Sequence, residues 1–340
     1  MTTIKDIARI SGYSIGTVSR VLNNKADVSD EARSRIESVI REQNYQPNSN
    51  AKKLKQSASS GIAVIVRGMN NIFLDSVLEE IQFRMKEHGE NISVHFLDEA
   101  ENETDAALQI SVSTRPNGII FLGGSPLSFG RSFSEITVPC VLVTASAASL
   151  GFSNLSSFTT DDYSASGYAV SKLIGCGHRR IGIIGGRLAP GSEDGISGRI
   201  NGAVAAITGA GLPFDAGICY EPCSFSMQAG YDAAGTLLDR FPDMTGLFAV
   251  SDTLALGAIR AFSDRGLSAP EDISVIGFDG IDFSGFSSPR LTTVKQDIAE
   301  LASRSVDDLL LRINYGRPAA HTVIPFSFIE GESISSPRSA

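Results

Sequence analysis

The first forty residues carry apolar side chains at the spacing of short amphipathic helices. Ile4, Ile7, Ala8 and Ile10 share one face of a first predicted helix. Gly12 then interrupts the pattern, since glycine adopts a left-handed turn without steric cost. The pattern therefore predicts one short helix that ends in a tight turn.

A second and a third helix are predicted beyond this turn. Ser14 is a candidate N-cap, and Val18, Val21 and Leu22 form the buried stripe of the second helix. The third helix is expected to start at Ser29 and to close a small core. Two short helices joined by a glycine turn are the helix-turn-helix arrangement, whose second helix enters the major groove of DNA.

The outward face of the second helix is the candidate DNA-reading surface. Arg20 is the strongest candidate, because its guanidinium can bond both acceptors of a guanine, a contact worth about 1–3 kcal/mol of discrimination. An exposed helical Arg is usually a solvated surface residue, and only its place on a recognition helix favours the base contact. The residues of the head expected to contact DNA are Thr3, Ser14, Ile15, Gly16, Thr17, Ser19, Arg20 and Asn23.

A short basic stretch follows at residues 47–57. A single helix of this length is unstable alone in water, so we expect it to fold on DNA. Its lysines would then meet phosphates while Leu54 inserts between base pairs in the minor groove. Taken alone, the stretch also suits a charged linker. The residues expected to contact DNA here are Asn48, Ala51, Lys52, Leu54 and Lys55.

From Gly61 onward, short apolar runs alternate with amphipathic segments. Near-continuous apolar runs are typical of parallel strands that are covered on both faces. The predicted strands are 62–66, 92–96, 118–122, 140–143, 181–184, 247–250 and 274–278, and the predicted helices include 73–88, 163–175, 199–209, 253–265 and 298–313. This alternation predicts a doubly wound α/β architecture, and its length suits two similar lobes.

Composition and charge agree with a small head and a larger body. The 340 residues exceed the usual size of a single core. No apolar run is long enough to cross a membrane and no secretory segment opens the chain, so we expect a cytoplasmic protein. Residues 1–60 hold ten Lys and Arg against six Asp and Glu, a net charge of +4. Because the whole chain has a net charge of −9, residues 61–340 carry −13. A basic head on an acidic body orients a protein on DNA.

Signals for catalysis or metal binding are missing. The four cysteines form no Cys-x-x-Cys pair, and the four histidines are scattered, so the ligand spacing of a zinc site is absent. No hydrolase elbow, phosphate-binding loop or dinucleotide fingerprint is present either. We therefore expect neither an enzyme nor a bound cofactor. Free thiols in a reducing compartment are the expected state of Cys140, Cys176, Cys219 and Cys223.

Several segments closely resemble the LacI/GalR family of bacterial transcription regulators. In the head they are residues 3–8, 16–23, 44–48 and 51–54. In the body, residues 177–186, 249–258, 272–279 and 291–294 resemble landmarks of the same family and of the periplasmic sugar-binding fold that it shares. The resemblance implies that Ile15, Gly16 and Arg20 occupy base-reading positions and that Leu54 occupies the minor-groove wedge.

The resemblance also implies a domain plan in which the chain crosses three times between the lobes. We expect the crossings near Thr160, at 291–294 and at 320–323. The plan comprises an all-α head at 1–46, a hinge at 47–60, a first lobe at 61–159 with 293–320, a second lobe at 160–292 with 321–334, and a tail at 335–340. A ligand would lie between the lobes at the carboxyl ends of the strands.

Four residues are the main candidates for ligand contact. Asp279 ends a predicted strand, Asp161 lies where the chain enters the second lobe, and Arg199 opens a predicted helix. Two carboxylates and a guanidinium supply acceptors and donors for polyol hydroxyls, and Phe73 suits the apolar face of a sugar. The resemblance implies ligand contact at the same four positions. Each has a structural alternative: an Asp at a strand end is often a helix cap, and Arg199 has Glu193 and Asp194 nearby.

Departures from the family pattern add further candidates. Thr144 and Ala145 stand where many relatives have Asp-Arg, and Ser251 stands where Asn is common. The first-lobe side of the site is therefore expected to be less polar than usual, which argues against an ordinary hexose. The additional candidates for effector contact are Ser125, Thr144, Phe225 and Ser251, whereas Asp252 also suits a helix cap.

Together these observations predict a homodimeric, ligand-responsive transcription regulator, a repressor that binds a palindromic operator in double-stranded DNA. The expected effector is a carbohydrate. A corepressor-type regulator that responds to a purine or a phosphosugar is the main alternative, since only the conformation preferred by the ligand differs. A solute-binding receptor would need an export signal, and a sugar-acting enzyme would need Asp161 and Asp279 about 5–5.5 Å apart for retaining chemistry.

Overall fold

The structure, a computed structural model, divides the chain into two compact units, residues 1–60 and 61–340. It describes residues 4–14, 17–18, 21, 29–42, 61–68, 71–98, 101–187 and 195–338. The division falls where the hydrophobic pattern changes from amphipathic helices to apolar strands. Within the described residues, no helix is both long and apolar enough to cross a membrane.

The first unit contains helices α1 (Ile4–Ser11) and α3 (Asp30–Glu42) around a small apolar core. The buried residues of this core are Ile7, Ala8, Val18, Val21, Ile36 and Val39. Ile10, expected on the buried face of α1, is exposed, and Ser11 is buried in its place. A helix advances about 100° per residue, so positions 7, 8 and 11 lie on one inward face while position 10 turns away from it.

The turn after α1 forms as predicted. Gly12 has a φ of +78°, and the Thr17 amide donates a hydrogen bond to the Ser14 hydroxyl oxygen at 3.1 Å. Ser14 is thus the N-cap of the segment that holds Val18. The other residues expected to contact DNA lie outside the described residues: Thr3, Ile15, Gly16, Ser19, Arg20, Asn23, Asn48, Ala51, Lys52, Leu54 and Lys55.

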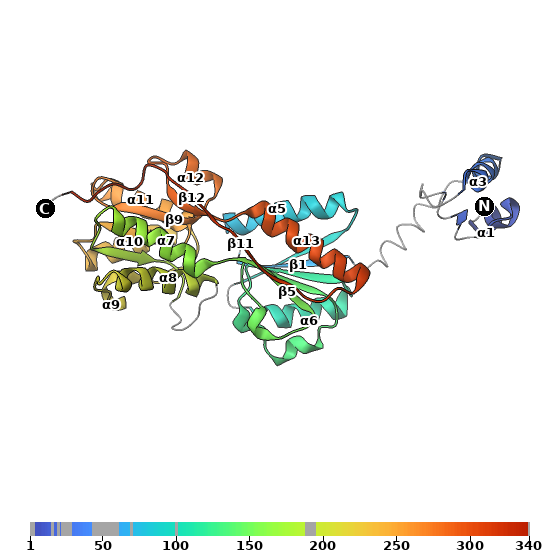
Figure 1. Cartoon of the computed structure of the whole chain (residues 1–340), viewed down its shortest axis with the longest axis horizontal. Coiled ribbons are helices and arrows are strands. Elements are labelled where there is room, and N and C mark those ends of the chain that lie inside the picture. Colours follow the sequence, from blue (N-terminus) through green and yellow to red (C-terminus); the bar gives the residue numbers. More distant parts are fainter. Residues whose placement is uncertain are drawn as a thin grey trace. The chain divides into compact units, whose positions relative to one another are not determined.

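The first lobe of the second unit is built on a parallel sheet in the order β11-β5-β4-β3-β1-β2. Its strands are β1 (Ile62–Arg67), β2 (Ile92–Leu97), β3 (Gly118–Leu122), β4 (Cys140–Val143), β5 (Leu155–Thr160) and β11 (His321–Ile324). Helices α5 (Ile72–Glu87) and α13 (Ile298–Tyr315) cover one face and α6 (Glu103–Ser113) the other (Figure 1). Successive residues of β1 enter opposite layers, which explains its continuous apolar run.

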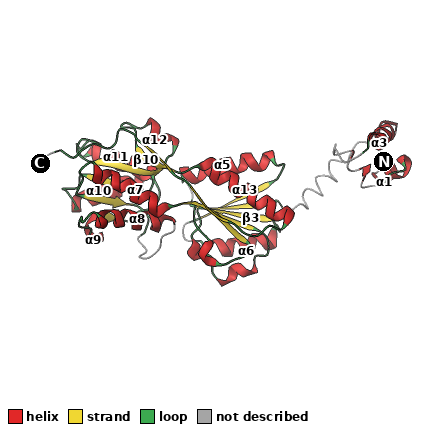
Figure 2. Ribbon diagram, in the orientation of Figure 1, coloured by secondary structure: helices red, strands yellow, loops and turns green. Residues whose placement is uncertain are grey.

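The second lobe repeats this plan with the order β12-β10-β9-β8-β6-β7, in which only the β12 edge strand is antiparallel. Figure 2 shows the two sheets in separate lobes. The strands are β6 (Ile181–Ile184), β7 (Tyr220–Glu221), β8 (Gly246–Ala249), β9 (Ser274–Asp279), β10 (Thr292–Lys295) and β12 (Ser327–Ile329). The helices are α7 (Asp162–Gly175), α8 (Gly195–Gly209), α9 (Ala216–Cys219), α10 (Met227–Arg240), α11 (Asp252–Asp264) and α12 (Asp282–Phe286).

The predicted two-lobed α/β architecture is confirmed, with two kinds of error. The strand at 92–96 was expected to be covered on both faces, yet β2 is an edge strand and Phe96 is half exposed. Strand β5 was not predicted, because its sequence Leu-Ser-Ser-Phe-Thr-Thr is polar although fully buried. The Ser156 hydroxyl accepts bonds from the Arg312 guanidinium and the Ala320 amide, both at 3.0 Å, so burial leaves it paired.

The lobes are joined by three crossings, two of which were placed too early. β5 ends at Thr160 and α7 begins at Asp162, in agreement with the expected first crossing. β10, however, belongs to the second sheet, so the second crossing follows Lys295 instead of lying at 291–294. β11 belongs to the first sheet, so the third crossing lies at 325–326 instead of 320–323. Hydropathy marks a strand but not the sheet that it joins.

Candidate functional site

A buried charged network lies at the carboxyl end of β9. Asp279, the last residue of that strand, is buried and has a φ of +116°. Its Oδ1 accepts hydrogen bonds from Arg199 Nη1 and from Gln296 Nε2, both at 2.9 Å. A non-glycine residue in this conformation carries a strain of about 1–3 kcal/mol, which is typical of functional sites. The network therefore holds the Asp279 carboxylate in a fixed orientation.

Arg199, in α8, joins this network to the rest of the second lobe. Its Nε donates to Asp162 Oδ1 at 2.7 Å and its Nη1 donates to the Val250 carbonyl at 2.8 Å. The guanidinium carbon lies 3.8 Å from the centre of the Phe278 ring, a close cation–π contact. The alternative partners Glu193 and Asp194 lie outside the described residues. Within the described residues, Arg199 is thus the cation that forms ion pairs with two buried carboxylates, Asp162 and Asp279.

The first carboxylate of this network is Asp162, the residue after the predicted effector candidate Asp161. Asp161 is exposed and its Oδ1 accepts the Ser164 amide at 2.9 Å, so it caps helix α7. Asp162, in contrast, is buried against Arg199. The sequence pair Asp161-Asp162 does not reveal which side chain turns inward, because the direction depends on where the first helical turn begins.

Burial and mutual attraction set the protonation of the network. Burial raises the pKa of Asp162 to about 6, although the Arg199 charge opposes this shift. Burial likewise raises the pKa of Asp279 against the attraction of Arg199. Burial alone would lower the pKa of Arg199, but the Asp279 and Asp162 carboxylates raise it. The guanidinium therefore stays charged, and the carboxylates are the groups that respond to pH.

Asp252 and Ser251 form hydrogen bonds that fix the backbone next to the network around Arg199. The Asp252 carboxylate is fully buried and accepts bonds from the Gly280 and Ile281 amides at 2.8 and 2.9 Å. It also accepts from the hydroxyls of Ser284 and Thr293. The Ser251 hydroxyl accepts the Leu254 amide and is the N-cap of α11. The cap expected of Asp252 is thus made by Ser251, and both residues are buried.

The effector candidates in the first lobe are buried or half-buried. Phe73 is 3% exposed, in an apolar cluster that also contains Ile281 of the second lobe. The expected stacking of this ring on a sugar is therefore not supported by its packing. Thr144, half-buried after β4, has a φ of +78°, the same kind of strained strand end as Asp279. Ser125 is half-buried in the loop after β3, and Phe225 is half-buried against the core of the second lobe.

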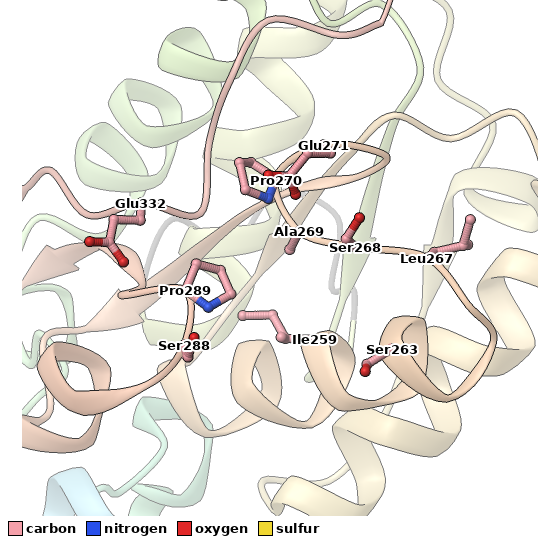
Figure 3. Close-up of a pocket in the computed structure, with 10 residues that line it drawn as sticks. All are labelled: Ile259, Ser263, Leu267, Ser268, Ala269, Pro270, Glu271, Ser288, Pro289 and Glu332. Atoms are coloured by element: carbon pink, nitrogen blue, oxygen red, sulfur yellow. The ribbon is translucent and has the colours of Figure 1, made fainter.

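A surface pocket of about 510 Å³ lies elsewhere in the second lobe (Figure 3). None of the predicted effector residues lines it. Its walls are Ile259, Ser263, Leu267, Ser268, Ala269, Pro270, Glu271, Ser288, Pro289 and Glu332. In the part of the chain that the structure describes, no group of His, Cys, Asp and Glu is arranged to hold a metal ion.

The network around Arg199 does not include the predicted Asp161, and it includes two residues that were not predicted, Asp162 and Gln296. Arg199 and Asp279 were predicted for the effector site and lie together in this network. Contact with an effector stays a prediction for all four. Gln296 directly follows β10, which was not predicted as a strand, so its place beside Asp279 had no hydropathy signal. The arrangement supplies fixed acceptors and donors at a strand edge and suits a hydroxylated ligand better than bond-breaking chemistry, which needs a nucleophile or a proton carrier beside the substrate.

Comparison with known proteins identifies the chain. Profiles described as "Bacterial regulatory proteins, lacI family" and "Periplasmic binding protein-like domain" match residues 3–48 and 170–334. The chain is 34% identical over 334 residues to the HTH-type transcriptional regulator MalR of Clostridium butyricum, across 97% of this chain and 98% of MalR.

Solved structures agree with this relationship. The Lac repressor dimer bound to operator and the anti-inducer ONPF has a TM-score of 0.77 at 24% identity, over 98% of this chain and 99% of that one. A LacI family transcriptional regulator from Enterococcus faecium with bound ribose has a TM-score of 0.68 at 27% identity, over 81% of this chain and 98% of that one. The chain therefore belongs to the LacI family of bacterial regulatory proteins, which are DNA-binding transcription regulators and not enzymes.

Proposed function

We propose that this chain is a homodimeric, cytoplasmic repressor whose affinity for a palindromic operator is set by a carbohydrate bound at the carboxyl edges of the two sheets. The observation that carries the proposal is the buried network of Asp162, Arg199, Asp279 and Gln296. A carboxylate that already accepts two donors on one oxygen keeps its other oxygen for a hydroxyl donor. Such a pair of fixed donors and acceptors matches a polyol.

The course of the chain supports a site between the lobes. β5 of the first sheet and β10 of the second both end immediately before a crossing. Both carboxyl edges are therefore next to the opposite lobe. Thr144, the residue after β4, and Asp279, the last residue of β9, belong to different sheets and both have positive φ angles. Strain at matching places in the two lobes is expected where each edge presents groups to a common ligand.

Relatives support the ligand class and the assembly. The regulator from Enterococcus faecium binds ribose, and the Lac repressor dimer binds operator DNA. A two-fold dimer presents two helix-turn-helix heads to two half-sites about one helical turn apart. Arg20 as the base-reading residue and Leu54 as the minor-groove wedge are part of this proposal.

The proposed mechanism is a coupling between the site and the hinge. β1 begins at Ile62, directly after the basic stretch that ends the first unit, and its other end, Arg67, lies at the edge where the ligand would bind. A ligand that changes the relation of the lobes also changes the spacing of two hinge segments in a dimer. A coupling free energy of roughly 1–3 kcal/mol, about 5- to 150-fold in affinity, is enough for a switch.

The test is a ligand-dependent change in operator affinity that Asp279→Asn removes. Operator DNA is first selected by the full-length protein from a random pool. Its dissociation constant is then measured by fluorescence anisotropy with and without ribose, glucose, cellobiose or sucrose. We expect at least one sugar to change the affinity of the wild type by fivefold or more, and Asp279→Asn to abolish the change.

Asp243→Asn is the matched control, because Asp243 forms an exposed ion pair with Arg180 in the same lobe. It should respond as the wild type does. A full response in Asp279→Asn would refute the site assignment. The direction of the wild-type response separates an inducer, which weakens operator binding, from a corepressor, which strengthens it.

A further inference from the structure

A second guanidinium–carboxylate pair lies at the carboxyl edge of the first sheet, apart from the network around Arg199. Arg67 is the last residue of β1, and a quarter of its side chain is exposed. Glu103 is the first residue of α6, and its side chain is 1% exposed. Arg67 Nη1 donates to Glu103 Oε1 at 2.7 Å and to the Ser128 hydroxyl at 3.2 Å. The pair therefore has one buried partner and one partner at the surface.

Glu103 fixes the surroundings of Arg67. Its Oε1 also accepts the Ser125 amide at 3.0 Å, so one carboxylate joins β1, α6 and the loop after β3. Its Oε2 is buried and meets no donor among the described residues. Exposed ion pairs are common and contribute little, but a fully buried carboxylate with an unsatisfied oxygen is rare and points to a functional constraint.

The register of the strands places this pair among the first-lobe candidates. Val66 is paired with Leu122 and Leu122 with Val143. The residues that follow these positions therefore lie along one edge, in the order Arg67, Gly123 and Thr144. Ser125, two residues after Gly123, is held directly by Glu103. The first-lobe edge is thus more polar than the sequence indicated, because a charged pair replaces the expected neutral surface.

We propose that Arg67 is a specificity-determining residue of the effector site, that Glu103 positions it, and that the pair selects uncharged polyols over phosphorylated ones. This inference rests on the proposed function, because it assumes that the effector lies at the carboxyl edges of both sheets. It goes further by excluding a phosphosugar as the effector, and it assigns two residues that the sequence did not identify.

The electrostatic reason lies in the partners of the two guanidinium groups. A phosphate beside Arg67 would meet a guanidinium whose charge is already balanced by Glu103, and Glu103 is too buried for water to screen it. Arg199 in the second lobe faces two carboxylates, Asp162 and Asp279, so it has no excess positive charge to offer a phosphate. A hydroxyl group, in contrast, accepts an N–H bond without adding charge. Both pairs therefore favour a neutral ligand.

The test compares neutral sugars with their phosphate esters on the full-length protein. Ribose, glucose, cellobiose and sucrose, each beside its phosphate ester, are measured by isothermal titration calorimetry. We expect the wild type to bind at least one neutral sugar, and to bind it tenfold or more tightly than its ester. Glu103→Gln keeps an acceptor for Arg67 and the Ser125 amide but removes the charge. It should shift the ratio toward the ester by about tenfold, or about 1.4 kcal/mol.

Two further variants separate selectivity from structure. Glu300→Gln removes the same charge from an exposed ion pair with Arg304 in the same lobe, so its ratio should equal that of the wild type. The double variant Arg67→Gln/Glu103→Gln leaves no buried charge unpaired. It should lose the gain for the ester and about tenfold of the affinity for the neutral sugar, because the donor itself is gone.

The outcomes distinguish this inference from the proposed function. An ester that binds the wild type more tightly than its sugar, a ratio unchanged in Glu103→Gln, or binding of none of the neutral sugars overturns the inference. If Asp279→Asn abolishes sugar binding while Glu103→Gln leaves the ratio unchanged, the inference fails and the proposed function stands. If Asp279→Asn binds sugars as the wild type does, the proposed function itself fails.

Discussion

Replacement of Arg199 by Met should destabilise the second unit strongly, and more at high pH than at low pH. In the wild type the guanidinium accompanies two buried carboxylates, with donor–acceptor distances of 2.7 Å to Asp162 and 2.9 Å to Asp279. Met fills part of the space but supplies no charge. Removal of one partner from a buried ion pair typically costs about 3–5 kcal/mol, since it leaves an uncompensated charge.

The pH dependence follows from the direction of the pKa shifts. Burial already raises the pKa of Asp162 to about 6 and raises that of Asp279. Without Arg199, which favours their charged forms, both pKa values should rise further above those of the unfolded chain. The folded variant then binds more protons than the unfolded one, so its stability falls as the pH rises from about 4 toward the raised folded values.

Urea unfolding followed by circular dichroism at 222 nm provides the measurement. At pH 8 we expect Arg199→Met to lose about 3–5 kcal/mol, and at pH 5 roughly 1–2 kcal/mol, because each unit of pKa is worth about 1.4 kcal/mol. Adding Asp162→Asn and Asp279→Asn to the variant should recover most of the loss at pH 8. A loss below about 1 kcal/mol at pH 8, or an equal loss at both pH values, would refute the reasoning.

Three further predictions concern packing and DNA contact. Asp252→Ala removes the acceptor that four donors share, of which the Thr293 hydroxyl keeps another acceptor, the Val294 carbonyl. The substitution should cost about 3 kcal/mol or more, and an unchanged urea midpoint would contradict this. Gly202→Ala places a methyl group against the Tyr163 carbonyl oxygen and should cost about 1–3 kcal/mol, whereas Gly209→Ala meets nothing within 4 Å and should not destabilise; equal melting temperatures would contradict this. Leu54→Ala should weaken binding to the selected operator about tenfold or more while leaving nonspecific DNA binding nearly unchanged, and equal losses in anisotropy titrations would exclude the wedge.

The fold was predictable where hydrophobic burial alone determines an element. β1 and β3 consist of apolar residues that face two covered layers, so their runs are continuous in the sequence. β5 is buried as completely, but the hydroxyls of its Ser156 and Ser157 form hydrogen bonds with Arg312, Ala147 and His321, which all lie outside the strand. A polar strand of this kind has no local signature, because its partners are defined only by the tertiary structure.

The site was predictable as a set of residue types but not as a set of contacts. Arg199 and Asp279 could be proposed for the site because a charged residue at the end of an apolar strand or at the start of a helix is visible in the sequence. Successive residues of a helix are rotated by about 100°, so the exact start of α7 determines which side chain, Asp161 or Asp162, turns inward. The Arg67–Glu103 pair joins residues 36 positions apart, and the Arg at the end of an apolar strand was its only local signal.

The two guanidinium groups give a physical reason for the proposed control of the lobes by the effector. Each lobe contributes one guanidinium held by a buried carboxylate, Arg67 by Glu103 and Arg199 by Asp162. In each lobe the guanidinium has its carboxylate partners within the same lobe, so neither ion pair depends on contact between the lobes. A polyol that bonds to both guanidinium groups therefore adds contacts that exist only when the lobes are correctly placed. That difference in contacts between arrangements is what lets a ligand shift an equilibrium.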